Sequence, residues 1–169
     1  MTRHLIFCAV LFAACSTAHA EERLVPAPKG APMLLEALAD GVQIYVCEAK
    51  GSSYEWVFKS PEASLFDRNG RQIGQHYAGP TWMTADRASV VGEVVAKADA
   101  PTPGAIPWLL LRAKSHVGTG PLASAAFIRR AETVGGIAPA GGCDAAHNGE
   151  QARMRYSALY EFLGAAAKP

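Results

Sequence analysis

Short runs of β-branched and aromatic residues, separated by turn-forming residues, recur along most of this chain. Within the runs, side chains alternate in character with a period of two, which places alternate residues on opposite faces of an extended strand. The clearest runs occupy residues 42–48, 53–59, 89–98, 105–114 and 152–162. Glycine, proline or asparagine interrupts the stretches between them. Roughly eight strands at intervals of about 8 to 15 residues predict an all-β fold, a single antiparallel β-sandwich or barrel.

Three local features refine this prediction. Asn69 and Gly70 both tolerate positive φ and predict a two-residue hairpin turn. Residues 33–41, MLLEALADG, could form one or two turns of helix ended by a glycine. Residues 121–133, PLASAAFIRRAET, contain several good helix formers. We interpret that segment as a strand and keep a helix of about ten residues as the alternative.

The N-terminus has the features of a secretory signal peptide. A basic start at Arg3 precedes an apolar run, and the small-residue ending Ala18-His19-Ala20 predicts cleavage after Ala20. The apolar run is shorter than the about 20 residues of a membrane-spanning helix, so no transmembrane segment is predicted. The protein is expected to be exported, to a periplasmic or extracellular location. The alternative is a lipoprotein signal, in which Cys15 becomes a lipidated first residue.

The remaining chain divides into three parts. Residues 21–40 contain three prolines and predict an extended arm with a possible short helix. Residues 41–163 form the single β-domain, and 164–169 form a C-terminal tail. Removal of residues 1–20 takes away one basic residue and leaves 15 basic against 15 acidic residues. No basic stripe stands out, so nucleic acid is not a predicted partner.

Cleavage after Ala20 leaves only Cys47 and Cys143. Thiols in exported chains usually oxidise, so these two are predicted to form a disulfide, with two separately buried thiols as the alternative. The loop between them has about 95 residues, for which chain entropy gives on the order of 4 to 5 kcal/mol.

The segment GQHYAGPTW, residues 74–82, holds the best candidate functional residues. His76 lies beside Tyr77 and six residues before Trp82, and Asp86 follows ten residues after the histidine. A His–Asp pair can orient an imidazole as a general base. No Gly-x-Ser-x-Gly motif accompanies it. The simpler interpretation is a structural turn whose histidine bonds to the backbone.

Other motifs are weaker. No His or Cys spacing of a metal site occurs, so neither a metal nor a cofactor is predicted. Residues 118–123, GTGPLA, match a dinucleotide-binding turn but lack βαβ surroundings, and a hairpin turn explains them more simply.

Aromatic and basic residues supply the candidate ligand contacts. The aromatic neighbours of Trp56 place it in the core, whereas Trp82 and Trp108 adjoin prolines and could expose a ring face to a ligand such as a sugar. Arg129 is a candidate anion-binding residue, and Arg130 is expected to pair with Glu132 if it points inward.

Five segments carry a resemblance to a known family. They are GVQIYVCEA, YEWVFKSPEASLFDRNGRQIGQHYAGPTW, VVGEVVAKADA, AIPWLLLRAKSHVGTGPL and FIRRAETVGGIAPAGGCD. In order and spacing the chain resembles, over about residues 41–162, the domain-of-unknown-function family numbered 3455, a family of secreted bacterial and fungal proteins. The resemblance implies a secreted single domain without an established activity. The chain departs from the family pattern in two places: Arg87-Ala88 replaces Gly-Ser, and Leu159 replaces an aspartate.

These observations predict an exported, non-enzymatic β-sandwich protein that acts as a binding or cell-envelope-associated module. Its partner would be a small molecule, a glycan or an envelope component. The alternative is a hydrolase-like enzyme that uses His76 with Asp86 and an arginine.

Overall fold

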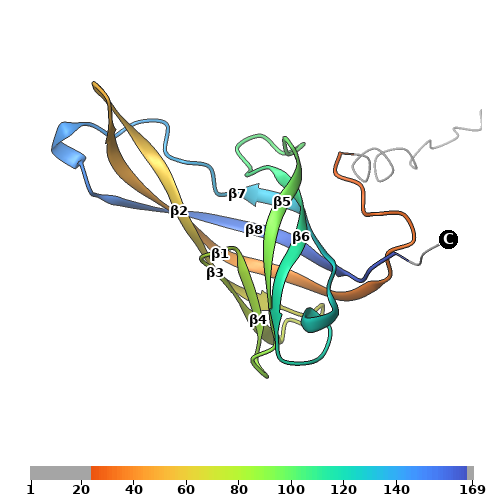
Figure 1. Ribbon diagram of the computed structural model, residues 1–169. Helices are drawn as coiled ribbons and strands as arrows, with labels where there is room; N and C mark the ends of the chain where they lie inside the picture. The colour runs from red at the N-terminus through yellow and green to blue at the C-terminus, as the bar shows by residue number, and fades with distance from the viewer. Residues whose placement is uncertain (1–23, 167–169) are drawn as a thin grey trace, which may run out of the picture.

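The alternating runs of the sequence form eight antiparallel strands in one sheet that closes on itself. In the computed structural model, which describes residues 24–166, each strand pairs with the next along the chain and the first pairs with the last (Figure 1). The strands are β1 (Met33–Lys50), β2 (Ser53–Phe66), β3 (Gln72–Tyr77), β4 (Thr81–Thr84), β5 (Ser89–Ala98), β6 (Trp108–Val117), β7 (Phe127–Gly135) and β8 (Gln151–Leu163). The all-β prediction is confirmed, and of its two forms the fold is the barrel.

Residues 1–23 and 167–169 lie outside the described part of the chain. The predicted signal peptide, its cleavage after Ala20 and the alternative lipidation of Cys15 all fall there. None of the helices in residues 24–166 is long and apolar enough to cross a membrane.

The helix predicted over residues 33–41 is wrong, because this segment is the first half of β1. Its local propensity for helix is overridden by pairing on both sides: Leu38 lies opposite Phe66 of β2 and Leu159 of β8. Gly41 does not end a helix. A Cβ at this position would collide with the carbonyl oxygen of Glu62, so the glycine permits close approach of β1 and β2.

Two other local predictions need correction. The β2–β3 turn spans residues 67–71, and only Gly70 has positive φ, at 78°. Asp67 organises this turn, because its carboxylate accepts from the backbone N–H groups of Asn69 and Arg71. The helix alternative for residues 121–133 is confined to a short 3-10 turn, η1 (Leu122–Ser124), before β7 begins.

The core lies in the barrel interior and is built from side chains of most of the strands. Its largest buried members include Leu65, Trp82, Leu111, Ile128, Tyr160 and Phe162. A second, smaller cluster lies on the outside, where Val25 of the N-terminal arm packs against Trp108 of β6 and Ala131 of β7. The arm therefore covers one outer face of the barrel.

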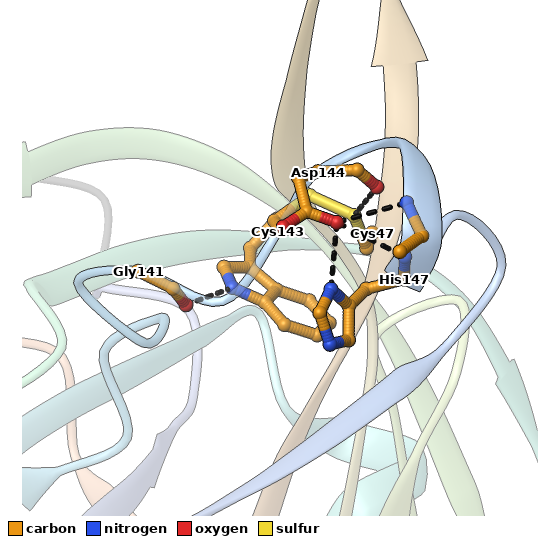
Figure 2. Close-up of a disulfide and its surroundings, with 7 residues drawn as sticks. Cys47, Gly141, Cys143, Asp144 and His147 are labelled. Atoms are coloured by element: carbon orange, nitrogen blue, oxygen red, sulfur yellow. Dashed lines mark hydrogen bonds and ion pairs between the residues drawn. A yellow bond between two sulfur atoms is a disulfide. The ribbon is translucent and has the colours of Figure 1, made fainter.

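The predicted disulfide between Cys47 and Cys143 is present. Figure 1 shows the β1–β2 hairpin and the β7–β8 loop projecting together beyond the barrel. The disulfide joins these two projections, and Asp144 next to it caps the 3-10 turn η2 (Ala145–His147) and pairs with His147 Nδ1 at 2.7 Å (Figure 2). Trp56 Nε1 also donates to the carbonyl of Gly141. The loop is thus fixed to the hairpin by covalent and polar contacts.

A candidate ligand-binding cavity inside the barrel

A cavity of about 450 Å³ lies inside the barrel, and all eight strands contribute to its wall. Most of the wall is apolar or aromatic, with Phe58, Val94, Leu109 and Leu111 among its members. Eight-stranded barrels have an interior wide enough to hold one small ligand, and small-molecule sites commonly measure about 300 to 1,000 Å³. The cavity therefore has the size and lining of a small-molecule site.

His76 on β3 forms part of this wall. It is buried, its Nδ1 lies 2.9 Å from the carbonyl oxygen of Thr81, and its ring stacks on Trp82 with centroids 4.3 Å apart and planes 5° apart. Because a carbonyl only accepts, Nδ1 carries the proton. Burial is the main cause that lowers the pKa of His76 to about 3. The side chain is accordingly a neutral imidazole at physiological pH.

Trp82 and Tyr160 continue the aromatic wall. Their ring centroids lie 5.3 Å apart in an edge-to-face arrangement, and the Tyr160 ring meets His76 in the same way at 5.1 Å. Burial raises the pKa of Tyr160 above its ordinary value, so its hydroxyl stays protonated. Three strands, β3, β4 and β8, thus supply one continuous aromatic surface.

Two buried N–H donors on the wall have no acceptor within residues 24–166. They are Nε2 of Gln43, which is 3% exposed, and Nε1 of Trp82, which is 1% exposed. Buried polar groups are nearly always hydrogen-bonded, and an unmade bond costs about 1 to 3 kcal/mol. These donors therefore mark places where a bound molecule can be recognised.

Arg130 brings a positive charge to the same wall. Its Nε and Nη2 both donate to the carbonyl oxygen of Pro107, at 3.0 and 2.8 Å, and it makes no ion pair within the described chain. Burial raises the pKa values of Tyr45, Tyr156 and Tyr160, and the charge of Arg130 opposes that rise at each tyrosine. The guanidinium therefore acts electrostatically across the interior. Its predicted pairing with Glu132 is not found, because a bulge with positive φ at Glu132 interrupts the alternation of β7.

The other basic candidate, Arg129, points to the outer face of the barrel. Its Nη1 pairs with Glu161 of β8 at 2.6 Å, and its Nε donates to the carbonyl of Val25. The guanidinium also lies over the ring of Trp108, 5.6 Å from the centroid. Arg129 and Trp108 thus belong to a buried structural cluster beneath the N-terminal arm, and neither lines the cavity.

The exposure of the three tryptophan side chains is the reverse of what the sequence predicted. Trp82 and Trp108 were expected to expose a ring face to a ligand, but their side chains are only 1% and 3% exposed. Trp56, expected in the core, is only partly buried because its strand projects beyond the barrel. Tyr77 faces away from the cavity, and its hydroxyl lies 3.8 Å from Met83 Sδ.

Asp86 and His76 are not brought together. Asp86 is exposed in the β4–β5 turn, where its carboxylate accepts from the Thr84 hydroxyl and the Ala88 N–H. These hydrogen bonds, the Thr84 hydroxyl first, lower its pKa. His76 lines the barrel cavity and Asp86 lines a separate groove. The enzyme hypothesis thus has no His–Asp hydrogen bond in this structure to support it.

Within residues 24–166, no group of three or more His, Cys, Asp and Glu side chains is placed to hold a metal ion. His116 Nε2 bonds the carbonyl of Ala125 at 2.6 Å, and His147 pairs with Asp144 beside the disulfide (Figure 2). Both histidines have local structural partners.

Sequence reasoning singled out His76 and Trp82 of this wall but missed the roles of Gln43 and Arg130. Gln43, Tyr45 and Cys47 lie on the same face of β1. This face is the buried one, although the opposite face carries the apolar residues Val42 and Ile44. A glutamine within a buried run was the available signal. A period of two identifies two faces but does not say which one points inward.

Comparison with known proteins identifies the family. A family model described as "Protein of unknown function (DUF3455)" matches residues 27–164, and the chain belongs to this family. No curated protein and no solved structure matches the chain.

Proposed function

We propose that this member of the DUF3455 family is an exported binding protein that holds a small, largely apolar molecule inside its barrel. The observation that carries the proposal is the cavity of about 450 Å³ whose wall draws on all eight strands. Burial of apolar ligand surface there contributes about 25 cal/mol per Å² of area removed from water, before the costs of association.

Export is supported by the disulfide between Cys47 and Cys143, because such bonds persist in oxidising compartments. A role in glycan binding receives less support, since the tryptophans offered for sugar stacking are buried. A small apolar molecule suits the aromatic wall better than a glycan or a large envelope component does.

The proposal can be tested with an uncharged fluorescent probe, N-phenyl-1-naphthylamine, titrated into the oxidised protein. Val94 lines the cavity and its neighbour Val95 does not, yet both are 49% exposed. We expect Val94→Trp to reduce probe binding by filling the cavity, and Val95→Trp to leave it unchanged. Equal effects of the two substitutions, or no saturable binding by the wild-type protein, would contradict the proposal.

A further inference from the structure

Almost all polar side chains on the cavity wall can donate hydrogen bonds. Gln43 Nε2 and Trp82 Nε1 are buried donors without an acceptor in the described chain. Arg130 adds a guanidinium group. Only its Nε and Nη2 atoms donate to the Pro107 carbonyl. An arginine has five N–H donors, so donors remain for a ligand beyond those used by the Pro107 carbonyl and by the neighbouring Tyr160 hydroxyl.

The charges on the wall have one sign. Arg130, Lys59 and Lys97 line the cavity, and no aspartate or glutamate of residues 24–166 does. Lys59 is neutralised by Glu48 at 2.7 Å, whereas neither Arg130 nor Lys97 has a carboxylate partner in the part of the chain that the structure describes. An unpaired cation in a partly buried site is unfavourable unless something compensates it. A negatively charged ligand group would do so.

The donor set also indicates which anion fits. A guanidinium is planar and matches the two oxygens of a carboxylate in a bidentate arrangement. Lys97 is exposed whereas Arg130 is partly buried, and the other donors on the wall, on Gln43 and Trp82, are neutral. The buried part of the wall therefore offers one full positive charge in combination with N–H groups. This suits a monoanion such as a carboxylate better than a phosphate dianion, which needs more positive charge.

We infer that the ligand is an amphiphile with a carboxylate, whose apolar part packs on the aromatic wall and whose carboxylate is bound by Arg130 together with Gln43 and Trp82. This inference rests on the proposed function and names the chemical class of its ligand. It gives Arg130 a role in specificity, whereas the proposed function alone requires only an apolar cavity.

The test compares three probes that share one alkyl chain: decanoate, 1-decanol and decylammonium. Each is titrated below its aggregation limit into the oxidised wild-type protein by displacement of N-phenyl-1-naphthylamine. A hydrogen bond to a charged group contributes enough to expect decanoate to bind roughly 10- to 100-fold more tightly than decanol. Decylammonium should bind most weakly, because like charges repel.

The variant Arg130→Met should remove the preference for decanoate while binding of decanol persists. Gln43→Met, which retains the size of the side chain and deletes its donor, should weaken decanoate binding several-fold and serves if the arginine variant fails to fold. Arg112→Gln is the matched control, because Arg112 is exposed on β6 and does not line the cavity.

The outcomes separate the two proposals. If decanol and decanoate bind equally to the wild-type protein, or if Arg130→Met keeps the full preference, the inference is overturned and the apolar binding function stands. If none of the probes displaces N-phenyl-1-naphthylamine, or that dye itself does not bind, both are overturned.

Discussion

Burial of the neutral His76 should make the barrel sensitive to mild acid. Burial lowers the pKa of this imidazole to about 3, against an ordinary value of 6.5 in the unfolded chain. Between these values the unfolded state binds a proton that the folded state does not, so stability is present above pH 6.5 and is lost as the pH falls. At pH 5, about 1.5 pH units below the pKa of 6.5 in the unfolded chain, the free energy of unfolding should be lower by roughly 2 kcal/mol than it is above pH 6.5.

The substitution that isolates this effect is His76→Phe, which retains an aromatic ring to stack on Trp82 and removes the titrating group. It leaves the Thr81 carbonyl without its donor, so the variant should be less stable at neutral pH by about 1 to 3 kcal/mol. Its decline between pH 7 and pH 5 should nevertheless be smaller than that of the wild-type protein by roughly 2 kcal/mol.

The assay is urea unfolding of both oxidised proteins at pH 7, 6 and 5 and constant ionic strength. The quantity compared is the change in unfolding free energy with pH, in which the constant cost of the lost hydrogen bond cancels. Parallel pH profiles for the two proteins would refute the reasoning, as would an imidazole of His76 that titrates near pH 6.5 in the folded protein by NMR.

Three further predictions concern stability. Arg87 is exposed and has a φ of 67°, a conformation that favours glycine, so Arg87→Gly should raise the unfolding free energy by about 0.5 to 1 kcal/mol in urea titrations; a lower value would contradict this. Reduction of the bond between Cys47 and Cys143, 96 positions apart, should cost about 4 to 5 kcal/mol, and without reductant neither cysteine should react with a thiol label. Glu161→Gln leaves the buried Arg129 without a counter-charge and should cost about 3 to 5 kcal/mol by chemical unfolding, whereas an unchanged midpoint would show the pair to be dispensable.

Much of the fold could be predicted because period-two alternation and turn residues are local signals. The prediction failed where pairing outweighed local propensity. Residues 33–41 contain leucine, alanine and glutamate, which favour helix, but β2 and β8 supply partners for them on both sides. The signals at Asn69-Gly70 located a real turn, although the side chain of Asp67 determines its form.

The candidate site could be predicted only in part. His76 and Trp82 were identified from an unusual local composition, and both line the cavity. The inward direction of Arg130 depends on which face of β7 meets the interior, and the arm that covers Trp108 comes from a segment far away in the sequence. Such placements follow from closure of the sheet, which no local pattern specifies.

The pairing of β1 with β8 also affects how the chain folds. Met33 lies opposite Leu163, so the contacts that close the barrel join residues from the two ends of the described chain. Contacts of such high sequence separation slow folding, since the entropy of the long loop is lost before the pairing compensates for it. Until β8 has emerged from the ribosome, β1 and β7 keep unpaired edges, which are prone to intermolecular association. The barrel is therefore expected to close only after β8 has been synthesised, and chains that end before β8 should aggregate.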